Sequence, residues 1–94
     1  MELTQNYDQV WSVYIIEAEN GFFYTGITKS LQDRFEAHKL KKSGAKFFRI
    51  SKPKQIVYFE KNLSHTDALK KENAIKMLSR REKIALIEDF TKNG

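Results

Sequence analysis

Two apolar segments joined by an Asn-Gly turn restrict this chain to folds built around a small, covered sheet. Val10–Ala18 (VWSVYIIEA) and Phe22–Ile27 (FFYTGI) are rich in the β-branched and aromatic residues that favour strands. Asn20-Gly21 between them is a strong signal for a β-hairpin. Because both faces of this hairpin are apolar, we expect helices to cover both sides of the sheet that contains it.

The rest of the chain contains one more strand and three helix starts. Gln55–Glu60 (QIVYFE) has the composition of a strand and follows a basic loop at Ser43–Pro53. The element order β-β-α-β-α-α contains no βαβ series, so it predicts an α+β fold with a small, three-stranded, mainly antiparallel sheet. A length of 94 residues predicts one domain, residues 1–94, with its core at about 10–90. Each predicted helix begins at a serine N-cap: Ser30 to about Lys42, Ser64 to about Leu78, and Ser79 to about Phe90.

Composition narrows the classes of function. The chain has no cysteine, which excludes a disulfide framework, a thiolate zinc site and a thiol nucleophile. It has no apolar run long enough to span a membrane and no secretory signal pattern, so we predict a cytoplasmic protein without a membrane partner. Residues 29–54 carry nine Lys or Arg residues and two acidic ones, whereas residues 1–28 carry four acidic residues and no Lys or Arg. This separation of charge favours a polyanionic partner, most commonly nucleic acid.

The loop of the hairpin decides where its two central tyrosines point. A two-residue loop would place Tyr24 opposite Glu17, on the sheet face away from Tyr14. A three-residue loop, with Gly21 in the left-handed conformation, would place Tyr24 opposite Ile16 and on the same face as Tyr14. The sequence permits both arrangements.

Several short motifs follow one another in a specific order along most of the chain. In that order they are Ser12-Val13-Tyr14, Tyr24-Thr25-Gly26, Leu31-x-x-Arg34-x-x-x-His38, Gly44-Ala45-Lys46 and residues 68–79. Together they resemble the GIY-YIG nuclease family, and in particular its small single-domain bacterial branch. Ser12-Val13 and Thr25 depart from the residues that give the family its name, but both motifs keep their tyrosine and the second keeps its glycine.

The resemblance implies an endonuclease that uses one divalent cation, Mg²⁺ or Mn²⁺, held by a glutamate. It favours the three-residue loop, which places the two tyrosines together. Gly21 and Gly26 are expected to be structural turn residues. The catalytic residues implied for this chain are Tyr14, Tyr24, Arg34, His38 and Glu72, with Glu72 as the metal ligand. The basic residues expected to contact nucleic acid are Lys41, Lys42, Lys46, Arg49 and Lys76.

Two residues are rival candidates for the general base. Tyr14 could act as a phenolate or relay a proton, although deprotonating a phenol at pH 7 costs roughly 4 kcal/mol. Nearby cations such as Arg34, Lys46 and a metal ion would lower that cost. His38 is the rival because the ordinary pKa of histidine lies near neutrality. Arg34 suits bidentate contact with a phosphate better than a lysine would.

Each of these residues also has an ordinary structural explanation. The tyrosines could be half-buried strand residues, and Glu72 with Lys76 forms a common helix-stabilising pair. Their joint presence in family order favours a DNA endonuclease of low intrinsic sequence specificity. Its choice of substrate would then depend on DNA shape, such as a flap or branch, or on a protein partner. The alternatives are a non-catalytic nucleic-acid-binding module and a protein-interaction domain, which would show no salt-sensitive DNA binding.

Overall fold

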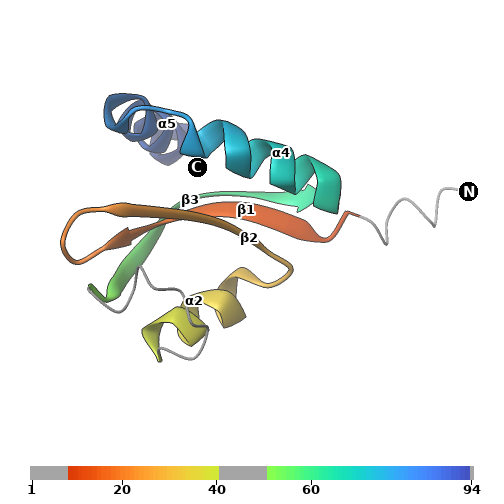
Figure 1. The fold of residues 1–94 in the computed structure, drawn as a ribbon, viewed down its shortest axis with the longest axis horizontal. Coiled ribbons are helices and arrows are strands. Elements are labelled where there is room, and N and C mark those ends of the chain that lie inside the picture. The colour runs from red at the N-terminus through yellow and green to blue at the C-terminus, as the bar shows by residue number, and fades with distance from the viewer. Residues whose placement is uncertain (1–8, 41–50, 94) are drawn as a thin grey trace, which may run out of the picture.

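The computed structural model describes residues 9–40 and 51–93, and these form the predicted α+β fold (Figure 1). The element order β-β-α-β-α-α is confirmed. The predicted end of the first helix near Lys42 lies outside the described residues. The elements are β1 (Trp11–Ala18), β2 (Phe23–Thr28), α2 (Leu31–Lys39), β3 (Pro53–Leu63), α4 (His65–Lys76) and α5 (Arg80–Asn93).

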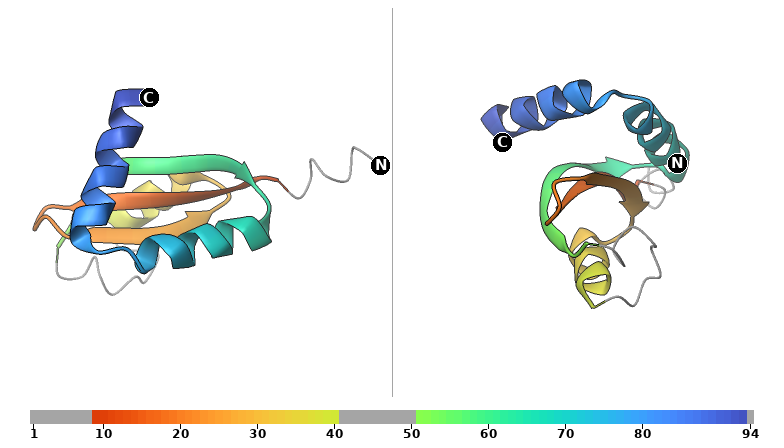
Figure 2. Two further views of the ribbon diagram at one scale, coloured as in Figure 1. Left: turned by 90° about the horizontal axis from the view of Figure 1, so that it is seen from above. Right: turned by 60° about the vertical axis from the view of Figure 1, so that its left-hand side comes forward.

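One three-stranded sheet separates two layers of helices. Its strand order is β2-β1-β3, and β1 pairs antiparallel with both neighbours. Helix α2 lies against one face, while α4 and α5 lie on the other (Figures 1 and 2). The prediction that helices cover both apolar faces of the hairpin is therefore confirmed.

The alternation of side chains along the central strand supplies a separate core to each layer. Val13 and Ile15 of β1 are fully buried on the side of α4. Tyr14, Ile16 and Ala18 point to the other side, where they form the core beneath α2. Residues of α4 and α2 complete the two cores: Ala68 and Ile75 on one side, Leu31 and Phe35 on the other.

The hairpin has the three-residue loop. Tyr24 pairs with Ile16, and the loop ends at Gly21, whose φ of +89° lies in the left-handed region. The amide of Gly21 donates to the carbonyl of Ala18 at 2.9 Å. Tyr14 and Tyr24 consequently lie on the same face of the sheet, and the turn role predicted for Gly21 is confirmed.

The prediction of a turn at Gly26 is wrong. Gly26 lies inside β2 and pairs with Tyr14 of β1, so the chain continues straight through it. Its lack of a side chain serves a close approach rather than a change of direction, as the site described below shows.

Strand β3 is longer than the predicted segment Gln55–Glu60. It pairs with β1 from Pro53 opposite Ala18 to Leu63 opposite Trp11. Its ends are held by pairing with the central strand and carry polar residues, which composition alone does not mark as strand. The C-terminal helices differ less, since α4 ends slightly before and α5 slightly beyond its predicted bound.

Local capping signals start all three helices as expected. Ser79 and Glu82 form a reciprocal capping box: the Ser79 hydroxyl accepts from the Glu82 amide at 3.1 Å, and the Ser79 amide donates to Glu82 Oε1 at 2.8 Å. Ser30 caps α2 and Ser64 caps α4, each by accepting an amide hydrogen bond at its hydroxyl oxygen.

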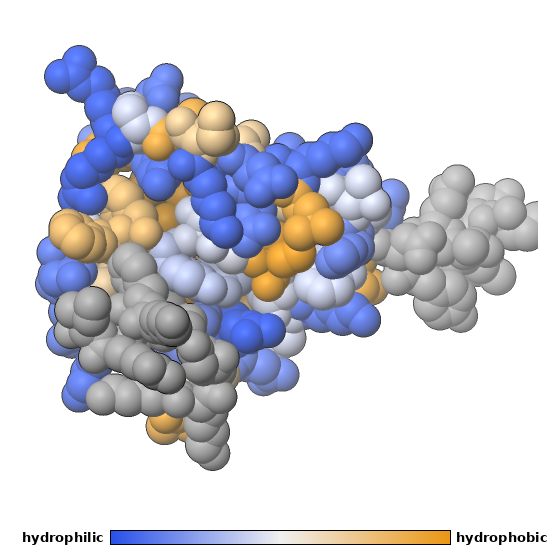
Figure 3. Space-filling model, in the orientation of Figure 1, coloured by the Kyte–Doolittle hydropathy of each residue, from blue (hydrophilic) through white to orange (hydrophobic). Residues whose placement is uncertain are grey.

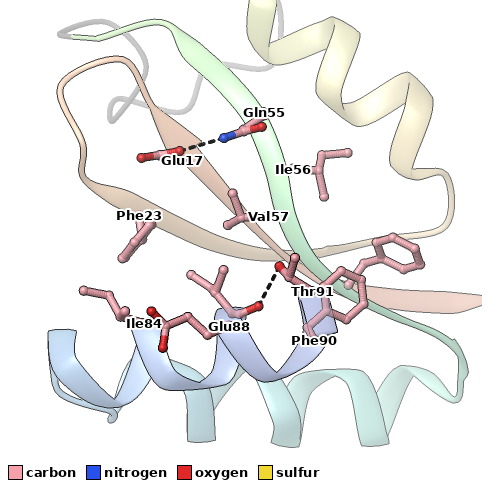
Figure 4. A pocket seen from close by; sticks show the side chains of 11 residues that line it. Glu17, Phe23, Gln55, Ile56, Val57, Ile84, Glu88, Phe90 and Thr91 are labelled. Carbon is pink, nitrogen blue, oxygen red and sulfur yellow. Dashed lines mark hydrogen bonds between the residues drawn. The ribbon is translucent and has the colours of Figure 1, made fainter. Parts of the chain in front are cut away.

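Helix α5 contacts the sheet at its start through Arg80 and near its end through the ring of Phe90. Arg80 Nη2 donates to the carbonyl of Gly21 at 3.1 Å, and its guanidinium lies 4.8 Å from the centre of the Phe23 ring. Beyond this point a hollow of about 770 Å³ separates α5 from the sheet, lined in part by Ile84 and Phe90 (Figure 4). Hydrophilic side chains cover much of the described surface in the view of Figure 3. Within the described ranges, every helix is too short or too polar to cross a lipid bilayer.

Candidate active site

Three rings gather on the face of the sheet that α2 covers. Tyr14 comes from β1, Tyr24 from β2 and His38 from the last turn of α2. The ring centres lie 6.3 Å apart for the two tyrosines, 5.3 Å for Tyr24 and His38, and 6.5 Å for Tyr14 and His38. Tyr14 Oη lies 3.3 Å from His38 Nε2, and both residues are only 2% exposed.

Gly26 makes room for this arrangement. A Cβ atom at this position would lie 2.6 Å from Tyr14 Oη and 2.8 Å from Tyr14 Cζ, distances that real Cβ contacts do not reach. The Tyr14 ring therefore lies directly over the backbone of β2 at Gly26. Because β2 is an edge strand, this carries the Tyr14 hydroxyl from the central strand towards the edge of the sheet.

Arg34 supplies positive charge to the cluster. It lies one helical turn before His38 in α2, so the two side chains share a helix face. Its guanidinium lowers the pKa of both His38 and Tyr14, which places the charge within electrostatic reach of both groups. The structure thus brings together the cation and the two ring residues predicted for the site.

Glu72 approaches the cluster from the opposite helix layer. Its side chain is 16% exposed and its carboxylate pairs with Lys76 Nζ at 3.3 Å, four residues further along α4. Helix α4 packs against β1 and β2. The negative charge of Glu72 raises the pKa of Tyr14, so the carboxylate lies within electrostatic reach of the Tyr14 hydroxyl although α4 covers the other face of the sheet. This influence across the sheet is consistent with the position of the Tyr14 hydroxyl over β2, near the edge of the sheet.

Arg34 lowers the pKa of Tyr14 as expected, but the net effect of the surroundings is to raise it. Burial is the largest influence and raises the pKa of the hydroxyl far above its usual range. Tyr24 and Glu72 raise it further, and the opposing effect of Arg34 is smaller than that of burial. Tyr14 is therefore a neutral hydroxyl at pH 7, which argues against a resting phenolate as the general base.

His38 is also neutral. Burial, followed by the positive charge of Arg34, lowers the pKa of His38 to about 4. In the tautomer that carries its proton on Nδ1, Nε2 accepts a hydrogen bond from the Tyr14 hydroxyl. A proton that moves from the tyrosine oxygen to the imidazole would leave a buried ion pair, unless the oxygen takes up another proton at the same time.

The burial of neutral His38 predicts that the free energy of unfolding decreases in acid. The unfolded chain binds a proton near pH 6.5, whereas the folded protein binds it only near pH 4. The stabilisation is complete above pH 6.5 and is lost as the pH falls towards 4. Urea unfolding at pH 7, 5.5 and 4.5 should show a smaller decrease in the free energy of unfolding for His38→Gln than for the parent.

Tyr14→Phe is the matched control for this measurement. It removes the hydroxyl that contacts His38 but leaves the histidine buried, so the parental pH dependence should remain. Identical pH dependence in the parent and in His38→Gln would contradict the assignment of this acid sensitivity to His38.

The residues of the site fit a hard divalent cation that takes most of its ligands from elsewhere. Among the described residues no group of three His, Cys, Asp or Glu side chains could enclose a metal ion. Mg²⁺ is commonly bound by one or two carboxylates, with substrate phosphate and water completing its shell. The largely covered carboxylate of Glu72, which acts electrostatically on the Tyr14 hydroxyl, is an oxygen donor of the right kind.

The remaining predicted site residues are basic residues expected to contact nucleic acid. Lys76 pairs with Glu72 and keeps 54% of its side chain exposed. A ring pair that the sequence does not predict lies beside Arg34, where Trp11 of β1 contacts His65 of α4 in a tilted arrangement. No sequence signal links these two residues, because they meet only through packing. The predicted nucleic-acid contacts Lys41, Lys42, Lys46 and Arg49 lie outside the described residues.

Comparison with known proteins identifies the family of the chain. The family model for the GIY-YIG catalytic domain matches residues 10–85. A UPF0213 protein from Pseudomonas aeruginosa is 47% identical over 77 residues, which are 82% of this chain and 73% of that protein. A UPF0213 protein from Staphylococcus saprophyticus is 38% identical over 77 residues, covering 82% and 93% of the two chains.

A solved structure is similar as well. The solution NMR structure of the UPF0213 protein BH0048 from Bacillus halodurans has a TM-score of 0.53 at 35% sequence identity, covering 83% of this chain and 82% of that one. The family match spans most of the chain and includes both tyrosines, Arg34, His38 and Glu72. The chain therefore belongs to the GIY-YIG family of nucleases.

Proposed function

We propose that this protein is a divalent-metal-dependent endonuclease that hydrolyses phosphodiester bonds in DNA. The observation that supports it most is the contact between Tyr14 Oη and His38 Nε2, within electrostatic reach of both Arg34 and Glu72. A neutral proton acceptor, a permanent cation and a carboxylate are the groups that such a hydrolysis requires around one phosphate.

The proposed role of the rings is to take a proton from the attacking water. Tyr14 gives its hydroxyl proton to His38 Nε2 while its oxygen accepts a proton from the water, which attacks phosphorus as hydroxide. The strongly raised pKa of Tyr14 makes this relay more favourable than a preformed phenolate. A phosphate bound at Arg34 would offset part of the repulsion that Arg34 exerts on protonated His38, and so would raise the pKa of His38 when substrate is present.

The other two residues act on the phosphate. Arg34 offers a planar fork of donors that matches phosphate oxygens. Glu72 would hold Mg²⁺ or Mn²⁺, and the bound cation would neutralise negative charge on the phosphate and the leaving oxygen. Contacts of this kind read the DNA backbone rather than base edges, which supports low intrinsic sequence specificity. In the same proposal, the substrate is chosen by DNA shape, such as a branch or flap, or by a protein partner.

Incubation with a panel of substrates tests this function. Purified protein with duplex, flap, branched and single-stranded DNA, and with RNA of matched structure, should cut DNA when Mg²⁺ or Mn²⁺ is present and not in EDTA. Tyr14→Phe should cut at least about a hundredfold more slowly, since general acid–base groups contribute that much or more. Salt-sensitive DNA binding without cutting in either metal would favour a non-catalytic binding module instead.

A further inference from the structure

A second hollow adjoins the candidate active site. Its volume is about 410 Å³, within the range of small-molecule sites. It lies where the start of β1, the β2–α2 connection and the first turns of α2 meet, and its lining includes Trp11, Lys29, Asp33 and Arg34. Arg34 therefore belongs both to this hollow and to the ring cluster of Tyr14 and His38.

An aromatic side chain and cationic side chains converge at this hollow. Trp11 is half-buried, and its ring lies 4.6 Å from that of His65 at an angle of 53°. Lys29 Nζ lies 5.5 Å from the centre of the Trp11 ring. Lys29 and His65 are both exposed, so each can move aside for a ligand or contact it. An aromatic ring beside cations is the combination on which proteins stack unpaired nucleobases.

The position of the hollow relative to Glu72 fits a strand of nucleic acid. His65 and Glu72 are seven residues apart on α4, which places them on one helix face about 10 Å apart along the axis. Successive phosphates of a stacked strand advance about 3.4 Å along the helix axis, so this separation covers roughly three nucleotide steps. Arg34 lines the hollow and also acts electrostatically on Tyr14 of the ring cluster.

We propose that Trp11, flanked by Lys29 and His65, stacks on an unpaired nucleobase of the DNA whose phosphate Arg34 binds. The inference rests on the proposed nuclease function and names its substrate class, namely DNA that is single-stranded within a few nucleotides of the cut. Bases inside a duplex are paired and stacked on one another, so they offer no free face to Trp11. Asp33 at the same hollow disfavours a second phosphate there, which leaves the uncharged base as the occupant.

The fluorescence of Trp11 reports on this subsite directly, because the chain has one tryptophan. In EDTA, titration with oligo(dT) of twelve nucleotides should quench the emission, with the same midpoint as the anisotropy of a labelled copy. An oligomer of the same length with abasic sugars should not quench it. Trp11→Leu should weaken oligo(dT) binding about tenfold, as expected for the loss of one stacked base, and leave duplex binding unchanged. Trp11→Phe should recover part of the affinity.

Two outcomes would overturn the inference. One is oligo(dT) binding by anisotropy with no change in the emission of the parent protein, which needs no variant to fold. The other is equal affinity of the parent and a folded Trp11→Leu protein, which would leave Trp11 with a packing role only. The nuclease function fails separately: quenching by oligo(dT) without metal-dependent cutting on any substrate would keep the subsite and reject the enzyme.

Discussion

Replacing Glu72 with glutamine should slow DNA cleavage at least about a hundredfold, which corresponds to roughly 3 kcal/mol of lost transition-state stabilisation. Glutamine keeps the shape and the helix propensity of the residue but removes the charge that would hold the metal. The lost ion pair with Lys76 should cost only about 0.2–0.5 kcal/mol of helix stability, so the fold should persist. Cleavage rates at saturating Mg²⁺ test the loss of activity. Thermal unfolding and metal-free DNA binding, measured in parallel, test whether the fold and the DNA affinity persist.

The same helix supplies a matched control. Glu60 of β3 pairs with Lys71 of α4 at 3.3 Å, the same separation as between Glu72 and Lys76. Glu60→Gln removes an equivalent ion pair from the surface, so cleavage should not change. DNA binding by Glu72→Gln without metal should hold or tighten slightly, because a negative charge near the phosphate has gone. Parental cleavage by the Glu72→Gln protein would refute the metal assignment.

Features of the fold that depend on neighbouring residues in the chain could be predicted from the sequence. The capping box at Ser79 is local, since its partner Glu82 lies within one helical turn. The sequence limited the hairpin loop to a length of two or three residues. The three-residue loop requires a left-handed backbone at its last position, which Gly21 adopts easily. The order of the strands and helices followed from the same local patterns, whereas the ends of β3 depend on pairing with β1.

Features of the site that depend on long-range packing could not be predicted in this way. The pKa of Tyr14 rises because α2 buries the hydroxyl, and no property of a strand pattern shows how deeply that helix will cover it. The charge of Glu72 raises the pKa of the same hydroxyl although α4 packs on the other face of the sheet, and the position of α4 depends on packing between the layers. The ring contact between Trp11 and His65 joins two segments that sequence spacing does not relate.

Replacing Gly26 with alanine should also reduce cleavage about a hundredfold, through Tyr14 rather than through the metal. The added Cβ would overlap Tyr14 Oη and Cζ, and this rigid, buried ring cannot swing away freely. A displacement of about 1 Å at a reacting group can cost about a hundredfold in rate. Overpacking of this kind should also cost about 1–3 kcal/mol of stability. The hydroxyl would lose its 3.3 Å contact with His38.

Gly21→Ala separates this effect from a general loss of stability. Its φ of +89° strains any residue with a Cβ, at a cost of about 1–2 kcal/mol, yet nothing lies within 4 Å of the added atom. The two alanine variants should therefore be destabilised to a similar degree in urea, while only Gly26→Ala loses cleavage. Equal cleavage by both variants at a temperature where both are folded would mean that the position of the Tyr14 hydroxyl does not matter for the reaction. Because Gly21 and Gly26 belong to the same hairpin, the difference in rate between them measures how strongly activity depends on the placement of that one oxygen atom.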